Sequence, residues 1–406
     1  MKILWFSNHQ FSEQQIKSTG TWLKSLGEEL SKTKDVDLFN ITHGKVNQIT
    51  HVDSKTIKQW IVPQSSLLPR AKIIKDIQII VDEIKPDIIH IWGLESYWGL
   101  LTSRGYLSGN VILEIQGIKF TIEKHFYSGL TFYDIIKCIG IKELIRPFGS
   151  ILGQKYTFKR WGKFEKEMLI THKHISTQSD WVRSHVQHLN ASATIYKTSI
   201  ALRSEFINAN KWDFNNCIPC QIFTSFSSIV SYKGLHILID AISILKKTNP
   251  NIKLVIAGNV SKGFREDGYT KWIKSKIKKL ELIDNIYWVG SLDANEIVWQ
   301  IQKANVIVIP SFVESYCLVL DEALTIGAPI VASYAGAMPE LAIHDKTALL
   351  FPPGDIEICA SYINKFLDDK LYSEQISANA YSNSRLKKIT DVAAIQLSIY
   401  HEVLNN

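Results

Sequence analysis

Between residues 306 and 327, the chain places three carboxylates around the predicted start of a helix. The apolar run at 306–309 is rich in β-branched residues and ends at a proline, which predicts a strand buried on both faces of a parallel sheet. A helix should follow, beginning near Ser315 and stopping at Gly327. In open α/β sheets, ligands bind at the carboxyl ends of the strands. The three carboxylates at this end belong to Glu314, Asp321 and Glu322.

The predicted helix start and the carboxylates favour different parts of one ligand. Backbone N–H groups in the first turn have no acceptors within the helix, so they suit a phosphate. Carboxylates repel a bare phosphate but accept hydrogen bonds from hydroxyl groups. A nucleotide sugar satisfies both, with Glu314 on the sugar hydroxyls and Glu322 on the ribose. The alternative is the solvated acidic face of an ordinary surface helix. The residues expected to hold the diphosphate are Ser315, Tyr316, Cys317 and Leu318.

The same stretch resembles a known family. Glu314 and Glu322, with seven residues between them, resemble the E-x7-E signature of retaining GT-B glycosyltransferases, most closely glycosyltransferase family 4, the group 1 glycosyl transferases. Residues 336–340, Gly-Ala-Met-Pro-Glu, resemble the G-G-x-P-E loop of that family. Residues 351–355, Phe-Pro-Pro-Gly-Asp, resemble its closing P-P-G-D turn. The resemblance implies a nucleotide-diphosphate sugar as donor.

A second segment extends the resemblance to a phosphate-binding cation. Lys233 and the glycine after it resemble the end of the family's G-R-x-x-x-x-K-G segment, whereas Ser228 stands at the arginine position. The resemblance assigns catalytic roles to Lys233, at the leaving diphosphate, and to Glu314. Gly20 opens a predicted helix, and Gly258 lies at the end of a predicted strand within 253–259. Both glycines are expected to let the donor approach the backbone closely.

Three residues of the amino-terminal half are predicted to position the acceptor. Residues 85–93 resemble the family's K-P-D-x-x-H-x-H-G segment, with His90 at the first histidine and Trp92 in place of the second. His90 has the alternative role of a satisfied core histidine. Gln116 occupies a position where many relatives have histidine, and its amide can donate a hydrogen bond but cannot act as an acid or base.

The domain organisation follows from length and alternation. The 406 residues, 46% hydrophobic and 21% charged, predict a globular chain of two or three domains. Alternating strands and helices predict an α/β protein with two Rossmann-like domains facing a cleft, the GT-B arrangement. We place the acceptor domain at 1–208, a hinge at 209–220 and the donor domain at 221–384. A helix at 385–406 should cross back to the first domain.

The sequence offers weak metal-binding motifs. Asp35-Val-Asp37 is a DxD at the start of a predicted strand, and Cys217 and Cys220 form a lone CxxC. Neither is accompanied by further ligands in sequence, so we expect no metal site and no cofactor. Five scattered cysteines and a quickly polar amino terminus indicate a cytoplasmic protein without a signal peptide.

A basic, aromatic segment suggests a membrane partner. Net charge is +7, and residues 119–167 hold ten lysines or arginines against five acids, with aromatic residues between them. Such a surface is typical of proteins that bind anionic membranes from the cytoplasmic side. No recognisable nucleic-acid module occurs, and simply solvated helices are the alternative. The expected contacts are Lys155, Lys159, Arg160 and Lys163.

Together, these observations predict a retaining, metal-independent hexosyltransferase that moves a sugar to a saccharide or lipid-linked acceptor in surface polysaccharide biosynthesis. Two alternatives stay open. One is a GT-B sugar-nucleotide epimerase, which shares the donor site and needs acid and base groups at the sugar. The other is a catalytically silent nucleotide-sugar-binding protein, suggested by Ser228 and Gln116.

Overall fold

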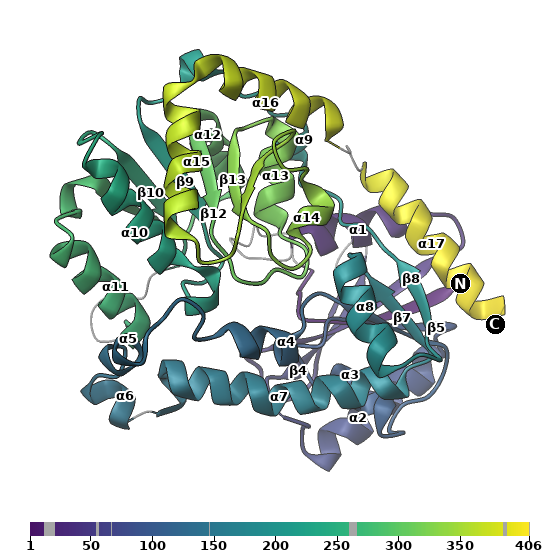
Figure 1. The fold of residues 1–406 in the computed structure, drawn as a ribbon. Helices are drawn as coiled ribbons and strands as arrows, with labels where there is room; N and C mark the ends of the chain where they lie inside the picture. The colour runs from purple at the N-terminus through teal and green to yellow at the C-terminus, as the bar shows by residue number, and fades with distance from the viewer. Residues whose placement is uncertain are drawn as a thin grey trace. The chain divides into compact units, whose positions relative to one another are not determined.

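The computed structural model describes residues 1–11, 21–53, 57–65, 67–145, 147–259, 266–384 and 388–405 (Figure 1). The chain forms two compact units, each assembled from separate stretches of sequence. Unit 1 comprises Met1–Ile118, Trp161–Arg203 and Lys387–Asn406, and unit 2 comprises Lys119–Arg160 and Ser204–Leu386. Each unit is built around one sheet with helices packed on it.

Unit 1 contains a sheet of eight strands among its described residues, in the order β3-β4-β2-β1-β5-β6-β7-β8. All neighbours are parallel except β3 and β4. The strand order reverses between β1 and β5, which defines a switch point where two neighbouring loops diverge. The strands are β1 (Lys2–Ser7), β2 (Asp37–Gly44), β3 (Thr50–Asp53), β4 (Lys58–Pro63), β5 (Ile88–Trp92), β6 (Val111–Ile115), β7 (His174–Thr177) and β8 (Thr194–Lys197).

The helices of unit 1 include the carboxy-terminal helix α17, which packs against α1. The hydroxyl of Tyr400 in α17 accepts a hydrogen bond from Trp5 Nε1 at 3.0 Å, so α17 completes the core around β1. The helices are α1 (Thr21–Leu30), α2 (Ala71–Ile84), α3 (Trp98–Ser103), α8 (Asp180–Leu189) and α17 (Ile389–Asn405). Helix α7 (Ile151–Thr171) contributes its residues from Trp161 onward.

Unit 2 contains a parallel sheet in the order β11-β10-β9-β12-β13-β14. Chain order therefore reverses between β9 and β12, as in a doubly wound sheet. Its strands are β9 (Gln221–Ser225), β10 (Lys253–Ala257), β11 (Ile286–Gly290), β12 (Val306–Ile309), β13 (Ile330–Ser333) and β14 (Leu349–Phe351). The predicted strand at 306–309 is confirmed.

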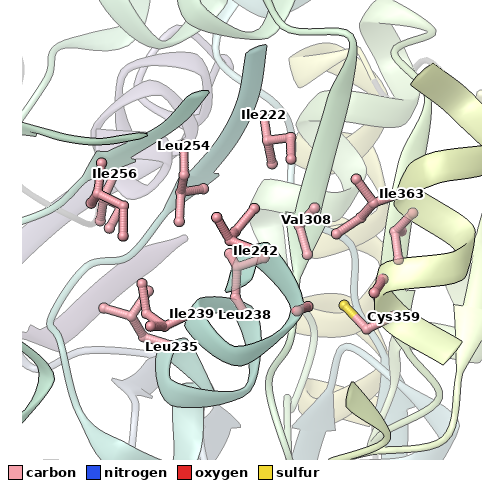
Figure 2. Packing of buried hydrophobic residues seen from close by; sticks show 14 of the residues in the cluster. Ile222, Leu235, Leu238, Ile239, Ile242, Leu254, Ile256, Val308, Cys359 and Ile363 are labelled. Carbon is pink, nitrogen blue, oxygen red and sulfur yellow. The ribbon is translucent and has the colours of Figure 1, made fainter. Parts of the chain in front are cut away.

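Apolar side chains from α10, α15 and all six strands of this sheet belong to one core cluster, part of which is seen in Figure 2. A buried Leu or Ile side chain typically contributes about 1.5–3 kcal/mol relative to exposure. The helices of unit 2 are α4 (Lys119–Ile122), α5 (Phe132–Lys137), α6 (Ile141–Ile145), α9 (Ser204–Ile207), α10 (Leu235–Lys246), α11 (Gly268–Lys279), α12 (Ala294–Lys303), α13 (Leu318–Ile326), α14 (Met338–Leu341), α15 (Ile356–Asp368) and α16 (Lys370–Asn383). The labelled core residues are Ile222, Leu235, Leu238, Ile239, Ile242, Leu254, Ile256, Val308, Cys359 and Ile363.

The units divide the chain differently from the predicted domains. Residues 119–160 were expected in the first domain but pack within unit 2, where the Phe126 and Tyr232 rings lie 5.3 Å apart. The hydroxyl of Ser231 also donates to the carbonyl of Phe126. Amphipathic helices show which face is buried but not which sheet covers it, so the sequence pattern could not make this assignment. The later break falls after Arg203 rather than after residue 208.

Membrane-spanning helices are not found among the described residues: none of their helices combines sufficient length with sufficient apolar character to cross a bilayer.

Candidate functional site

The loops after β9 and β12 bring Lys233 and Glu314 together at the switch point of the unit 2 sheet. Lys233 Nζ donates to both carboxylate oxygens of Glu314, at 2.7 and 2.8 Å. The Ser311 hydroxyl donates to Glu314 Oε1 at 2.7 Å. An ammonium group and a carboxylate, far apart in sequence, therefore lie where doubly wound sheets bind ligands.

Gly234 allows these loops to approach each other. Its φ is +74°, and a Cβ at this position would lie 2.0 Å from the carbonyl oxygen of Pro310. The backbone N–H of Phe312 donates to the carbonyl of Tyr232 at 2.9 Å, which ties the same two loops. A larger residue at 234 would separate Lys233 from Glu314.

The pair keeps Lys233 charged. Burial lowers the pKa of Lys233, but the adjacent Glu314 carboxylate more than offsets it, so the net pKa is raised well above its usual value. Glu314 already accepts three hydrogen bonds in this arrangement. A carboxylate has about four acceptor positions, so Glu314 can accept a further hydroxyl group while it holds the ammonium.

Helix α13 starts three residues later than predicted. Cys317, with φ of +84°, precedes its first residue, Leu318, and Gly327 ends it with φ of +76°. The left-handed backbone at Cys317 is uncommon for a residue with a side chain and is not visible in the sequence pattern. The N–H groups of Leu318 and Val319 have no acceptors within the helix and lie shortly after Glu314, where a phosphate-binding helix start is predicted.

The three carboxylates of this stretch have different surroundings. Asp321 accepts a hydrogen bond from the Tyr316 hydroxyl at 2.6 Å, and both residues are buried. Burial and this neighbouring carboxylate raise the pKa of Tyr316. Asp321 and Tyr316 thus bind each other, although Tyr316 was predicted to contact the donor. Glu322 lies on α13 and is 5% exposed.

The Gly-Ala-Met-Pro-Glu loop after β13 holds the backbone of Glu314. A Cβ at Gly336, where φ is +57°, would lie 2.0 Å from the Glu314 carbonyl oxygen. The N–H of Ala337 donates to that carbonyl at 2.9 Å. Two motifs recognised separately in the sequence therefore form one structural unit.

Of the two predicted donor-binding glycines, the structure describes Gly258 but not Gly20. Gly258 follows β10 at the carboxyl edge of the unit 2 sheet, and its N–H donates to the carbonyl of Gly290 at 2.8 Å. It lies on the edge that also carries Lys233 and Glu314. Gly20 lies outside the described residues.

His90 and Trp92 occupy the core of unit 1, where they cannot contact an acceptor. They are 0% and 3% exposed, and their rings stack at 3.9 Å. His90 Nδ1 lies 2.7 Å from the Tyr400 hydroxyl, and burial keeps the pKa of His90 well below its usual value. The structure corrects the predicted acceptor role of both side chains, because β5 is central and buried on both faces. Gln116 is half-buried just after β6.

Glu114 is a fully buried carboxyl group that sequence reasoning did not single out. It accepts hydrogen bonds from Thr198 Oγ1 at 2.8 Å and Gln178 Nε2 at 3.1 Å. Its second oxygen lies 3.9 Å from His90 Nε2. Burial raises the pKa of Glu114 to about 7, despite the opposing effect of these hydrogen bonds. A lone glutamate inside the apolar strand Val111–Ile115 was the available signal.

Glu95 is a second carboxylate that sequence reasoning passed over. It is exposed in the loop after β5, beside the switch point between β1 and β5. Gly93 has φ of +94°, and a Cβ there would collide with Glu95 Oε2. A Cβ at Gly117, after β6, would lie 3.8 Å from Glu95 Oε1. The signal was a strand, a glycine turn and a carboxylate in succession.

The weak metal motifs show no ligand cluster. Within the part of the chain that the structure describes, no group of three or more His, Cys, Asp or Glu side chains is arranged to hold a metal ion. Asp35 lies in a turn with φ of +63°, and Asp37 begins β2. The thiol of Cys217 donates to the carbonyl of Ala304 at 3.3 Å.

The loops that carry Lys233 and Glu314 lie within a region that matches a known family. Residues 219–383 match the model for "Glycosyl transferases group 1". The matched residues lie within unit 2 and make up less than half of the chain. Among curated relatives, glycogen synthase of Mycobacterium tuberculosis is 32% identical over 137 residues, which is 34% of this chain and 31% of the relative. The matched part thus spans about a third of that relative's length.

Similarity to solved structures extends over both units. Sucrose-phosphate synthase from Thermosynechococcus elongatus superposes with a TM-score of 0.75 at 16% identity, covering 100% of this chain and 99% of the other. Anabaena HepE, solved with UDP-glucose, gives a TM-score of 0.68 at 16% identity over 100% of both chains. The predicted GT-B fold, with two Rossmann-like parts, is confirmed.

Proposed function

We propose that this protein transfers a sugar from a nucleotide-diphosphate sugar to a saccharide or lipid-linked acceptor, with retention of anomeric configuration. The observation that carries the proposal is the Lys233–Glu314 pair beside the start of α13. It combines a cation, outward N–H groups and a hydroxyl-accepting carboxylate, which are the groups a nucleotide sugar requires. HepE, a protein of this fold, was solved with UDP-glucose, which supports a donor of this class.

Each donor-site residue then has a role in the transfer. When the bond between the sugar and the diphosphate breaks, negative charge collects on the leaving diphosphate. Lys233 and the N–H groups at Leu318 would stabilise that charge, since fixed charges and dipoles in a buried site act strongly on it. Glu314 would hold the sugar hydroxyls, and Glu322 the ribose hydroxyls. Ser315 and Cys317 would place the backbone that faces the phosphates.

On the acceptor side, we place Glu95 and Gln116 at the carboxyl edge of the unit 1 sheet. An exposed carboxylate accepts hydrogen bonds from hydroxyl groups. Glu95 therefore replaces His90 and Trp92 as the residue expected to position the acceptor. A role in surface polysaccharide biosynthesis on the cytoplasmic face of a membrane fits a lipid-linked acceptor.

The direct test is mass spectrometry of products from a panel of nucleotide sugars with saccharide and lipid-linked acceptors, followed by NMR of the new linkage. A product that keeps the donor's anomeric configuration supports the proposal. Isomerised donor in the absence of acceptor would instead identify an epimerase. Donor binding without any product would identify a silent binding protein.

We also propose that the transfer needs no metal ion, because Lys233 and α13 supply positive charge at the diphosphate. Turnover should stay within about twofold after treatment with a chelator, since the charge stabilisation is built into the protein. If the chelator abolishes turnover and a divalent ion restores it, the proposal is contradicted, and Asp35 and Asp37 become the candidate metal ligands.

A further inference from the structure

Exposed apolar side chains gather on two short helices of unit 2. Phe132 on α5 is 78% exposed, and Leu144 and Ile145 on α6 are 72% and 74% exposed. Tyr133 and Ile136 of α5 are exposed as well. Single exposed hydrophobic residues are ordinary, but a group of five large ones in neighbouring helices marks an interaction surface.

A lysine-rich helix lies directly beside this apolar group. Helix α11 contains five lysines and no carboxylate in its twelve residues. It packs against α5, and a Cβ at Gly268 would collide with the carbonyl of Cys138, between α5 and α6. Figure 1 shows α5 and α6 next to one end of α11. Apolar side chains and positive charge therefore share one region of unit 2.

Three of these lysines point their charge to solvent. Lys271, Lys278 and Lys279 are exposed, whereas Lys274 and Lys276 form ion pairs with Glu266 and Asp240. On α5, the ammonium group of Lys137 lies 4.0 Å from the centre of the Tyr133 ring. A cation over an exposed aromatic ring suits the interface between water and lipid.

We propose that these three helices dock unit 2 onto an anionic phospholipid bilayer. The α5–α6–α11 surface is defined by Phe132, Tyr133, Ile136, Lys137, Leu144, Ile145, Lys271, Lys278 and Lys279. The apolar side chains enter the boundary between headgroups and acyl chains, and the lysines bind anionic headgroups. This inference rests on the proposed function, in which the acceptor is lipid-linked, and it assigns the surface of unit 2 that contacts the membrane.

The chemistry of the surface favours a bilayer over other occupants. A second copy docking through the same face would set the α11 lysines against each other, because twofold contacts pair identical surfaces. Nucleic acid would bind the lysines but would leave Phe132, Leu144 and Ile145 without a partner. An anionic bilayer matches both the charge and the apolar group.

The surface shares α5 and α6 with the segment 119–167 expected from sequence, but its other lysines belong to α11 rather than α7. That expectation relied on α7, including Lys155, yet Lys155 Nζ lies 3.7 Å from Glu123 Oε1 and 4.1 Å from the centre of the Tyr127 ring. Its charge is largely engaged within unit 2. Lys159 and Arg160 remain exposed on α7 and provide the rival surface.

Flotation of the full chain with vesicles tests the apolar part. Phosphatidylcholine vesicles with and without about 30% phosphatidylglycerol are used as the probe, at low and high salt, since lipid electrostatics fade with salt. The wild-type chain should float with the anionic vesicles only, more weakly at high salt. The double variant Phe132→Ser, Leu144→Ser should bind at least tenfold more weakly. Leu371→Ser is the matched control, because Leu371 is also 78% exposed and lies on α16 of the same unit.

Charge reversal then separates the two surfaces. Lys271→Glu with Lys278→Glu should reduce vesicle binding at least tenfold, while Lys346→Glu, an exposed lysine of the same unit, should leave it unchanged. If Lys159→Glu with Arg160→Glu abolishes binding and the α11 reversal does not, the surface assignment is overturned. The assignment is also overturned if the wild-type chain does not bind vesicles. It is overturned as well if the wild-type chain sediments as a dimer and Phe132→Ser makes it a monomer, because the surface would then be a contact between two copies.

Donor binding separates this inference from the proposed function. Titration calorimetry with nucleoside diphosphates should give the same affinity for every surface variant, which also shows that each is folded. If the wild-type chain floats with vesicles yet binds no nucleoside diphosphate, the proposed function fails and the membrane surface stands. If the wild-type chain binds nucleoside diphosphate but does not float with vesicles, only the proposed membrane-binding surface is wrong.

Discussion

Two pairs of acidic and basic side chains, one in each unit, differ in where they sit on their sheets. Lys233 and Glu314 lie in loops beyond the carboxyl ends of β9 and β12, bonded at 2.7 and 2.8 Å. His90 and Glu114 lie within strands β5 and β6, fully buried, with 3.9 Å between Nε2 and Oε2. The first pair is charged, whereas burial lowers the pKa of His90 and raises that of Glu114.

The difference shows how position on a sheet changes what the same side-chain types do. Beyond a strand end, a charged pair faces the region where ligands bind and can exchange partners with them. Inside the sheet, a pair loses its water, and this favours the neutral form of both groups. Family motifs drew attention to both Lys233 and His90, but only Lys233 lies where chemistry is accessible.

The largest expected effect follows from removing the ammonium at the strand end. Lys233→Ala should lower turnover by about 10²–10³, because a fixed charge at the leaving diphosphate is lost. Steady-state kinetics measures this, with Lys346→Ala as the matched control on the same unit. Turnover within a few-fold of wild type would show that the pair is structural, like its counterpart in unit 1.

Removal of the second carboxylate of the signature should affect donor affinity. Glu322→Ala should weaken binding of nucleoside diphosphate by tenfold or more, since a hydrogen bond to a charged group contributes about 1.5–3 kcal/mol before water replaces it. Titration calorimetry measures the dissociation constant. Glu357→Ala, an exposed carboxylate on α15, is the control. Unchanged affinity in a folded Glu322→Ala protein would rule out the ribose contact.

The buried pair predicts an effect on stability that depends on pH. The pKa of Glu114 is raised from 4.5 to about 7 in the folded protein. Between these values the folded state holds a proton that the unfolded state releases, so this group's contribution to stability falls as pH rises and levels off above pH 7. The Glu114→Gln variant has no ionisable group at this position, so its stability does not fall with pH for this reason. Its free energy of unfolding, relative to wild type, should therefore increase by about 1–3 kcal/mol from pH 5 to pH 8.

Denaturant unfolding of both proteins at the two pH values measures this difference. Parallel pH curves for wild type and Glu114→Gln would mean that Glu114 is ionised in the fold. In that case, burial would not favour the neutral form of the His90–Glu114 pair, and the contrast with Lys233–Glu314 would not hold.

The smallest effect is expected at Glu95, which is exposed at a strand end of unit 1. Glu95→Gln should raise the KM for the acceptor a few-fold, which corresponds to about 0.5–1.5 kcal/mol for one hydrogen bond. Donor affinity should stay unchanged. Glu83→Gln, an exposed glutamate on α2, serves as control. An effect on donor affinity instead of acceptor KM would remove Glu95 from the acceptor side.

Sequence patterns predicted strands of unit 2 well, such as the one at 306–309, because apolar runs there end sharply at glycine or proline. The family resemblance assigned roles to both Lys233 and Glu314, and the structure adds that the two side chains form an ion pair. Sequence patterns could not assign residues 119–160 to a unit, because the pattern of an amphipathic helix shows which face is buried but not which sheet it packs against. They left His90 open between an acceptor contact and a core histidine, since a histidine inside a central strand and one at its end look alike in sequence. The left-handed backbone of Cys317 and the raised pKa of Glu114 depend on tertiary surroundings that no local pattern encodes.

The assembly of unit 1 from three separate stretches has a consequence for biosynthesis. Trp5 and His90 both reach the Tyr400 hydroxyl on α17, so this core cannot close while the ribosome has yet to make α17. Unit 2 needs nothing beyond Leu386 and can fold while α17 is still in the exit tunnel. The amino-terminal strands, synthesised first, therefore wait longest for their final packing, and a chaperone would meet them in that interval.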